Sequence, residues 1–266
     1  MAKHNMKTDH FSSKKAAEYY TKGRPYVHDD VIQRMSVFFN LKKTVEWALD
    51  IGCGTGLSAI ALKEIAHNVV ALDISYDMIA IAPREQDMYY VNAVAEYIPI
   101  AATSFELVTI SSAFHWFNEK QSANELNRVL KSSGRLVIYH NHLTPYQETY
   151  PEFEQWYYDI FKKRYPKPPR DYTIDLEYFK ELSIIFSGEE SCEKDIYFTA
   201  EQLMYHLLSL THVISAVESG REKYANVTNW LKTEITQFPV FRSGKDTADK
   251  VKFHFDGTIK YFQKQK

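Results

Sequence analysis

The chain has 266 residues, of which 45% are hydrophobic and 25% are charged, as in an ordinary globular protein. A chain of this length buries a sizeable core without disulfide or metal staples. With 32 Lys and Arg against 34 Asp and Glu, the formal net charge is −2. This balance argues against a dedicated nucleic-acid binder or membrane-surface binder, because both are usually basic.

The cysteine count and the first residues bear on the cellular setting. Cys53 and Cys192 cannot form a disulfide framework or a zinc cluster, so we predict a reduced, cytoplasmic protein with no metal site. The opening stretch MAKHNMKTDHFSSKK has no apolar run, unlike a secretory signal. No segment approaches the roughly 20 apolar residues that a membrane span needs. We therefore expect no membrane partner, and the oligomeric state stays open.

Residues 1–40 are predicted to form a helical head. A basic, polar stretch ends in a short helix, SSKKAAEYYTKG, which Gly23 stops. A second helix is predicted over residues 27–39, because apolar side chains recur there at steps of three and four residues.

Short apolar strands then alternate with helices across residues 41–140. Strands are predicted over 45–51, 68–73, 88–92, 106–111 and 135–140. Helices are predicted over 57–66, 76–82 and 119–131, with Gly134 ending the last one. Such alternation predicts an α/β fold, with a doubly wound parallel sheet covered by helices on both faces. Ligands of such sheets bind beyond the carboxyl ends of the strands.

From residue 141 to 245 the alternation stops, and a helical substrate lobe is predicted. Its helices are predicted over 150–164, 176–186, 200–217 and 222–236. In the closing stretch VKFHFDGTIKYF, Asp256 and Gly257 join two alternating segments, which is a strong hairpin signal. Residues 246–266 are therefore predicted to add an antiparallel hairpin to the sheet edge. The prediction is one domain with a helical lid insertion.

The most informative stretch is VEWALDIGCGTG, residues 45–56, where a strand ends in Asp50 and three glycines precede a helix. Glycines let a backbone turn sharply and approach a ligand closely. A triphosphate loop needs Lys and Ser or Thr after the glycines, and both are absent here. A dinucleotide loop needs a last glycine where this chain has Leu57. A helix-capping turn in another nucleotide fold is the remaining alternative.

S-adenosylmethionine fits this loop better. Asp50 can attract the ammonium group of the methionine moiety, directly or through water. Asp73 ends the second strand, where a carboxylate can bind both ribose hydroxyls, as in dinucleotide sites. Ile74 and Met78 follow and provide apolar surface for the adenine.

Several stretches together resemble a known family. They are DIGCGTG, ALDISYDMI, AVAEYIP, AFHWF and LNRVLKSSGRL. These stretches look like a class I S-adenosylmethionine-dependent methyltransferase, and within it the type 11 small-molecule group that includes trans-aconitate methyltransferases. The head pattern Ala17, Tyr20, Arg24, Pro25, Tyr26 is similar to that group. The resemblance covers residues 11–140 well and the helical lobe poorly.

The resemblance implies a Rossmann-like seven-stranded sheet and a set of cofactor contacts. Implied contacts are Asp50, Gly52, Gly54, Asp73, Ile74, Met78, Ala95, Glu96 and Ser111. It also implies that the head folds over the cofactor, with Tyr20 at the methionine end. The chain departs from the family at residues 92–94, where a glycine is common, and this departure weakens the assignment of the adenine site. It departs again at residues 131–134, a turn that should not touch catalysis.

The stretch after the fourth strand, residues 111–117, is expected to face the methyl group. His115 is either a base or a hydrogen-bond donor to the acceptor, or it packs the loop together with Trp116; we favour packing. Methyl transfer is an in-line displacement, and a carboxylate acceptor is already ionised at neutral pH, so it needs no base. Methylases of exocyclic amines usually carry Asn or Asp, two prolines and an aromatic residue here, and this chain does not.

Other residues have competing interpretations. Arg24 either pairs with a carboxylate of cofactor or substrate or is a surface residue. His140 and His142 mimic a metal pair, but a polar strand end is the favoured interpretation. The basic residues Lys162, Lys163, Arg164, Lys167 and Arg170 either select an anionic substrate or form a solvated loop, which is more common.

The sequence therefore predicts an S-adenosylmethionine-dependent methyltransferase that acts on a small molecule, most readily at oxygen and possibly on a carboxylate. S-adenosylhomocysteine would be its product. The alternatives are an RNA-modifying methyltransferase, which the balanced charge disfavours, and a non-catalytic protein that binds S-adenosylmethionine. The sequence does not identify the acceptor.

Overall fold

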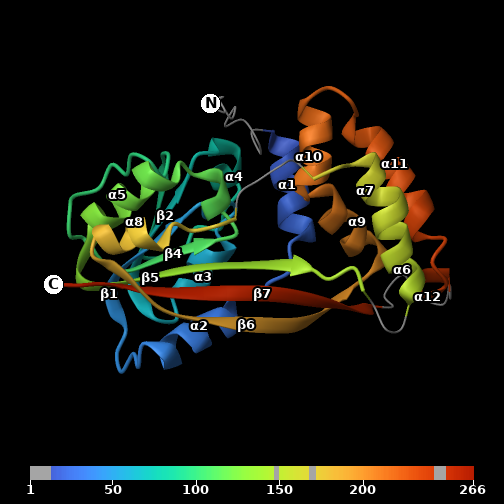
Figure 1. Cartoon of the computed structure of the whole chain (residues 1–266). Coiled ribbons are helices and arrows are strands. Elements are labelled where there is room, and N and C mark those ends of the chain that lie inside the picture. Colours follow the sequence, from blue (N-terminus) through green and yellow to red (C-terminus); the bar gives the residue numbers. More distant parts are fainter. Residues whose placement is uncertain (1–12, 147–149, 168–171, 243–249) are drawn as a thin grey trace. The chain divides into compact units, whose positions relative to one another are not determined.

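The computed structural model describes residues 13–146, 150–167, 172–242 and 250–266 (Figure 1). The chain divides into two compact units, each assembled from three segments. Unit 1 consists of Met1–Pro25, Leu143–Pro169 and Asp195–His254. Unit 2 consists of Tyr26–His142, Arg170–Lys194 and Phe255–Lys266. Among the described residues, none of the helices is both long and apolar enough to cross a membrane.

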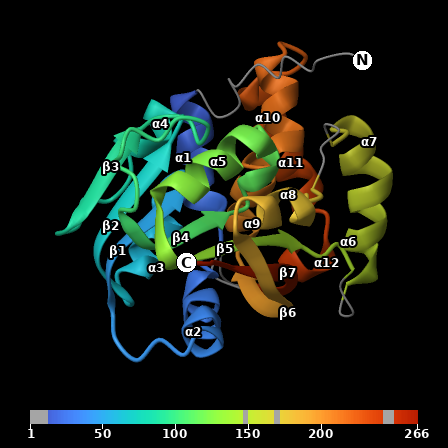
Figure 2. The ribbon, with the colours of Figure 1, turned by 60° about the vertical axis from the view of Figure 1, so that its left-hand side comes forward.

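A seven-stranded sheet in the order β3-β2-β1-β4-β5-β7-β6 organises unit 2 (Figure 2). Its strands are β1 Val45–Ile51, β2 Ala66–Asp73, β3 Met88–Asn92, β4 Phe105–Ser111, β5 Leu130–Leu143, β6 Ile184–Phe198 and β7 Val251–Lys264. The first five pair in parallel. β6 and β7 are antiparallel, because Gln265 bonds to Ser183 while Lys260 pairs with Glu189. The predicted fold class is confirmed.

Helices cover both faces of this sheet. One face packs against α2 His28–Phe38, α3 Leu57–Leu62 and α4 Tyr76–Ala80, with buried Met35, Leu62 and Ile79 in its core. The other face packs against α5 Glu119–Val129 and α8 Leu176–Glu181. β1, β2 and β4 each contain a run of buried residues, as expected for strands that are covered on both faces.

Unit 1 is largely helical. Its elements are α1 Lys14–Gly23, α6 Pro151–Trp156, a π-helix Tyr157–Phe161, α7 Lys162–Arg164, α9 Ala200–Leu208, α10 Thr211–Glu218, α11 Tyr224–Ile235 and α12 Pro239–Arg242. Its core is aromatic, and its rings include Phe153, Trp156, Tyr157, Phe161, Trp230 and Phe238.

The head helix α1 is held more firmly than its polar sequence indicates. Ser13 caps it by accepting from the Ala16 amide at 3.1 Å. Ala16, Ala17 and Tyr19 are buried. Gly23 lies directly on α9, since a Cβ there would come 2.2 Å from the backbone carbon of Tyr205. Small side chains therefore let α1 approach α9 closely.

Two predictions about the closing strands were wrong in detail. β7 runs without a turn through Asp256 and Gly257, so the antiparallel pair consists of β6 and β7. A Cβ on Gly257 would come 2.5 Å from the His140 carbonyl oxygen and 2.7 Å from Cys192 Sγ. The glycine thus permits close strand packing rather than a turn. β6 itself was expected to be part of the helical lobe.

Several predicted helices are shorter or divided. The expected helix over 150–164 is interrupted by the π-helix, and the one over 200–217 is two helices, α9 and α10. The helix expected over 176–186 ends at Glu181, and Ser183 then adopts a left-handed φ of 60° before β6. Gly134 lies inside β5 rather than at a helix end.

Candidate cofactor-binding site

The glycine loop at the carboxyl end of β1 has a backbone conformation that residues with a side chain rarely adopt. Gly52, Gly54 and Gly56 have φ values of 72°, 54° and 83°, in the left-handed region. A Cβ on Gly52 would lie 2.4 Å from the Cβ of Ala113. The amide of Gly52 donates to the Leu72 carbonyl oxygen at 2.7 Å, which ties the loop to β2. Glycine is therefore required here by both conformation and space.

Asp73 at the end of β2 lies against this loop. Its Oδ2 accepts from the Gly54 amide at 2.7 Å, and its Oδ1 accepts from the Ser75 amide at 2.8 Å. Burial raises the pKa of Asp73, and these backbone N–H donors oppose the rise by favouring the carboxylate. The carboxylate thus joins the loops after β1 and β2, where it was predicted to meet the ribose.

Asp50 is more enclosed than the sequence indicated. Its side chain is 0% exposed. Its Oδ2 accepts from Ser58 Oγ at 2.5 Å, and its Oδ1 accepts from Thr109 Oγ1 at 2.7 Å. Burial raises the pKa of Asp50 to about 7, with the two hydroxyl donors lowering it and the charge of Asp73 raising it. With both oxygens engaged and shielded, Asp50 has no exposed atom to offer an ammonium group directly.

The residues predicted to meet the adenine differ in exposure. Ile74 is 43% exposed and presents an apolar side chain after β2. Met78 and Ala95 are buried, with exposures of 2% and 4%. Glu96 Oε1 accepts from the Asn118 amide at 2.6 Å, so this carboxylate holds the residue that caps α5.

The expected methyl-facing stretch follows β4. Ser111 ends β4, in register with Tyr139 of β5. His115 and Trp116 lie on a 3-10 turn, Phe114–Trp116, and the His115 ring lies 4.6 Å from the Tyr172 ring, centre to centre. These aromatic side chains gather beyond the carboxyl end of β4, in the region where ligands of such sheets bind.

Tyr20 and Arg24 belong to unit 1, whereas every other predicted site residue belongs to unit 2. The Arg24 guanidinium lies 4.7 Å from the centre of the Tyr20 ring and donates to the Ser209 carbonyl oxygen at 3.1 Å. The two residues therefore contact each other, and their contact with the cofactor stays a prediction.

The other candidates have ordinary surroundings. Lys163 pairs with Asp159, and Arg164 pairs with Glu222, while Arg170 lies outside the described residues. The His140 and His142 rings lie 6.1 Å apart. Across the described ranges, no group of three or more His, Cys, Asp or Glu side chains is arranged to hold a metal ion.

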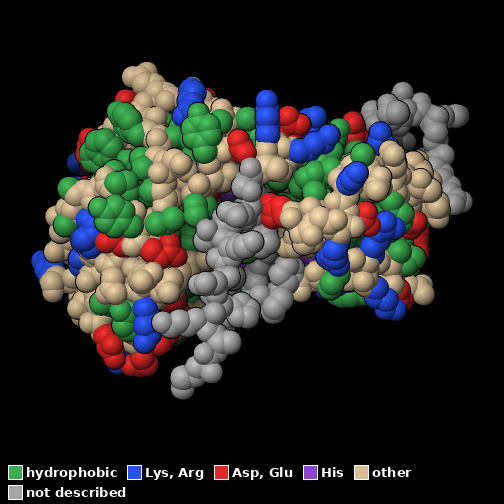
Figure 3. Space-filling model, turned by 90° about the horizontal axis from the view of Figure 1, so that it is seen from above, with side chains coloured by type: hydrophobic (Ala, Val, Ile, Leu, Met, Phe, Trp, Pro, Cys, Tyr) green, Lys and Arg blue, Asp and Glu red, His purple; other side chains and the backbone are tan. Residues whose placement is uncertain are grey.

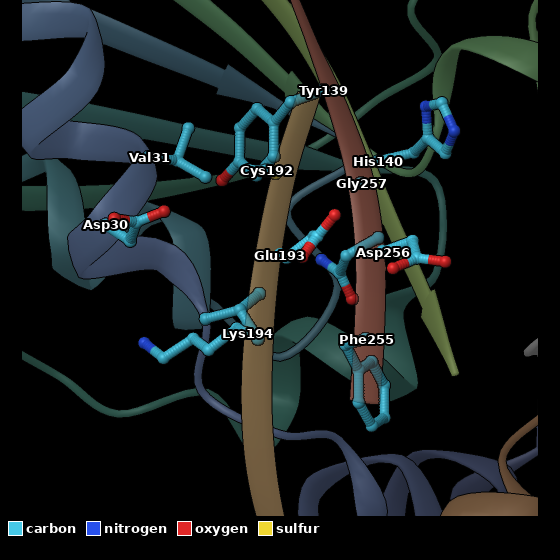
Figure 4. A pocket seen from close by; sticks show the side chains of 12 residues that line it. Asp30, Val31, Tyr139, His140, Cys192, Glu193, Lys194, Phe255, Asp256 and Gly257 are labelled. Carbon is cyan, nitrogen blue, oxygen red and sulfur yellow. The ribbon is translucent and has the colours of Figure 1, made fainter. Parts of the chain in front are cut away.

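A separate pocket lies between α2 and strands β5, β6 and β7 (Figure 4). Asp30, Val31, Tyr139, Cys192 and Lys194 are among the side chains around it. The Tyr139 hydroxyl bonds to Nδ1 of His28 at 2.8 Å. None of the predicted cofactor residues lines this pocket, so it is not part of the candidate site.

Three site residues were missed by the sequence reasoning. Ser58 and Thr109 bind Asp50, and only the sheet register, which pairs Asp50 with Thr109, reveals the second contact. Thr55 lies in the glycine loop with a buried Oγ1 that has no hydrogen-bond partner among the described residues. An unsatisfied buried hydroxyl in a loop with three left-handed glycines fits a loop that receives a polar ligand.

Residues 49–138 match the profile of a family described as "Methyltransferase domain". The malonyl-[acyl-carrier protein] O-methyltransferase of Buchnera aphidicola is 32% identical over 152 residues, which are 52% of this chain and 60% of that protein. A demethylmenaquinone methyltransferase of Renibacterium salmoninarum is 34% identical over 110 residues, 40% of this chain and 46% of that protein. The match thus spans about half the length of these relatives.

A solved structure has a similar fold. It is Haemonchus contortus phosphoethanolamine N-methyltransferase 2 in complex with S-adenosyl-L-methionine, with a TM-score of 0.53 and 16% identity, covering 97% of this chain and 59% of that one. At this identity the likeness shows the fold alone. Residues 49–138 therefore match a methyltransferase domain, and the fold of the chain is similar to that of a solved methyltransferase.

Proposed function

We propose that this chain is an S-adenosylmethionine-dependent methyltransferase that methylates a small molecule at oxygen, with a carboxylate as the preferred acceptor. The observation that carries the proposal is the loop of three left-handed glycines fastened to Asp73, within a matched methyltransferase domain. The name of the Buchnera relative, an O-methyltransferase, supports oxygen as the acceptor atom. The head pattern and the stretch around His115 support the small-molecule group that includes trans-aconitate methyltransferases.

The cofactor would be held by residues of unit 2. The carboxylate of Asp73 would accept hydrogen bonds from the ribose hydroxyls, and the exposed side chain of Ile74 would pack on the adenine. The glycine loop would let the backbone lie against the methionine moiety. When bound, S-adenosylmethionine supplies an activated methyl group on a sulfonium. As the resemblance implies, Tyr20 and Arg24 are proposed as further ligand contacts, and the helical residues 141–245 as the part of the chain that selects the acceptor.

To promote methyl transfer, the chain has to align the acceptor with the methyl group and exclude water from the site. A carboxylate acceptor is ionised at neutral pH, so no group has to remove a proton from it. His115 and Trp116 would then orient the acceptor beyond β4 rather than act as bases.

The charge distribution supports a small acceptor over RNA. On the face drawn in Figure 3, Lys and Arg side chains lie among Asp and Glu side chains rather than in one basic field. RNA binding would depend on many phosphate contacts and would weaken steeply with salt. A cytoplasmic location remains our proposal, supported by two free cysteines.

The proposal is tested by titrating the wild-type chain with S-adenosylhomocysteine and by following methyl transfer to a panel of carboxylates. Saturating ligand at about 100 times the dissociation constant should stabilise the fold by about 2.7 kcal/mol. Binding with no transfer to any small acceptor would favour a non-catalytic binding protein. Transfer to RNA alone would favour the RNA-modifying alternative.

Asp73→Ala is expected to weaken S-adenosylhomocysteine binding at least about tenfold, because a hydrogen bond to a charged group contributes roughly 1.5–3 kcal/mol. Asp73→Asn should have an intermediate effect, since it keeps one acceptor oxygen. Calorimetric titration measures both. Asp159→Ala removes an exposed carboxylate of unit 1 and serves as the control. A folded Asp73→Ala variant with an unchanged dissociation constant would contradict the ribose assignment.

His115→Gln is expected to slow methyl transfer to a carboxylate by less than about tenfold, because general-base catalysis typically supplies a hundredfold or more. The rate above about pH 6 should stay independent of pH, since no histidine near its ordinary pKa of about 6.5 has to accept a proton. Initial rates between pH 5.5 and 8.5 test this, with the same acceptor used for the wild-type chain and for His115→Gln. A loss above a hundredfold would move the assignment to a phenol or amine acceptor.

A further inference from the structure

We propose that Ser58 and Thr109 are positioning residues of the cofactor site, which act by holding the buried carboxylate of Asp50 and thereby closing the glycine loop. The inference deepens the proposed function and rests on it. None of the three side chains has to contact the cofactor. They would act through the backbone of the loop that lies between them and through the charge of Asp50, which attracts the ammonium group of the cofactor without direct contact.

The first step is the closure of the loop. Asp50 precedes the glycines, and Ser58 follows them in the first turn of α3. The Ser58 hydroxyl donates to Asp50 Oδ2 at 2.5 Å, so this single bond joins the two ends of the loop. A loop with three flexible glycines has much conformational entropy to lose, and fixing its ends lowers that cost when a ligand binds.

The second step fixes the carboxylate itself. Thr109 lies on β4, opposite Asp50 in the parallel register of β1 and β4. Its hydroxyl donates to Asp50 Oδ1 at 2.7 Å, so the carboxylate is oriented by one donor on each oxygen. All three side chains are nearly inaccessible to solvent, with exposures of 0% for Asp50, 4% for Ser58 and 1% for Thr109. In such surroundings a missing donor leaves a polar group unsatisfied, which is costly.

The charged groups around this cluster are few. Asp73 at the end of β2 raises the pKa of Asp50 by its charge, and burial is the larger cause. The Cys53 thiol of the loop and the Tyr90 hydroxyl of β3 also interact electrostatically with Asp50. Since burial and charge repulsion hold both of their pKa values above the ordinary values, these two groups stay neutral near pH 7. The two hydroxyl donors favour the ionised form of Asp50, so removing either one raises its pKa.

This predicts a pH signature that a purely structural role would not give. The ammonium group of S-adenosylhomocysteine favours an ionised Asp50, so affinity should rise with pH as Asp50 loses its proton near pH 7. In Thr109→Val, which keeps the shape but removes the hydroxyl, the midpoint of this rise should move to higher pH. In Asp50→Asn the rise should disappear.

The experiment is calorimetric titration of S-adenosylhomocysteine between pH 5.5 and 8.5. At pH 7, Ser58→Ala and Thr109→Val should each bind about tenfold more weakly than the wild-type chain. Thr109→Ser, which restores the hydroxyl, should recover most of the affinity. Matched controls are Ser122→Ala, a buried serine that donates to the Glu119 carbonyl oxygen, and Thr228→Val, a threonine bonded to Tyr19. Both should bind normally.

The inference would be overturned if folded Thr109→Val and Ser58→Ala variants bound with wild-type affinity and kept the wild-type midpoint of the rise in affinity with pH. The proposed function would then still stand. If Thr109→Val does not fold, Ser58→Ala carries the same test, because it leaves the Thr109 bond in place. Absence of S-adenosylhomocysteine binding by the wild-type chain would overturn both the proposed function and this inference.

Discussion

Replacing Gly52 by alanine is expected to abolish measurable S-adenosylhomocysteine binding, with a loss of at least about a hundredfold. An alanine at its φ of 72° costs about 1–2 kcal/mol in backbone strain alone. Its Cβ would also lie 2.4 Å from the Cβ of Ala113, so either the loop or the segment after β4 has to move. Both segments belong to the candidate site, so the substitution should lower the affinity for the ligand as well as the stability of the fold.

A matched control separates strain from collision. Gly220 has a similar φ of 77°, but a Cβ there would meet no atom within 4 Å. Gly220→Ala should therefore lose only the stability that backbone strain costs, and it should bind S-adenosylhomocysteine normally. Adding Ala113→Gly to Gly52→Ala removes the collision partner and should restore part of the affinity. Calorimetry and thermal unfolding measure these outcomes, and normal binding by Gly52→Ala would contradict the proposed loop geometry.

Gly23→Ala is expected to destabilise unit 1, although alanine normally stabilises a helix by 0.5–1 kcal/mol relative to glycine. At this position a Cβ would come 2.2 Å from the Tyr205 backbone carbon and 2.3 Å from the His206 amide nitrogen. Backbone atoms cannot rotate away as a side chain can, so α1 and α9 must separate. Overpacking of this kind typically costs about 1–3 kcal/mol.

Urea unfolding followed by far-UV circular dichroism measures the effect of Gly23→Ala. The sign is diagnostic, because helix propensity predicts stabilisation and the close contact predicts the opposite. Ser36→Ala provides a control substitution in α2, a helix of unit 2. If Gly23→Ala proves as stable as the wild-type chain or more stable, the contact between α1 and α9 is wrong.

The parallel strands were the part of the fold that the sequence predicted best. β1 and β3 begin and end where their apolar runs do, at Val45–Ile51 and Met88–Asn92. β1 is buried along most of its length, and both strands are rich in apolar or aromatic side chains that mark them in the sequence. β6 was missed because its exposed residues alternate with half-buried polar ones, which leaves little apolar signal. The hairpin turn predicted at Asp256 and Gly257 was wrong, because β7 runs straight through both residues and the glycine permits close strand packing.

The candidate site was predicted where it depends on local motifs and missed where it depends on register. Asp50, Asp73 and the glycines were found because each stands at a strand end or in a loop with a recognisable pattern. Thr109 follows Asp50 by 59 positions, and no local pattern links the two. The sequence predicted that Asp50 attracts an ammonium group, directly or through water, but it did not reveal that two hydroxyls bind the two carboxylate oxygens.

The contact between α1 and α9 has a consequence for synthesis of the chain. Gly23 bonds through its carbonyl oxygen to His206, 183 positions further along. At a synthesis rate of about 5–20 residues per second, α1 leaves the ribosome roughly 10–40 s before its partner exists. During that time the side chains of Ala16, Ala17 and Tyr19 have no α9 to pack against, although they are buried in the finished fold.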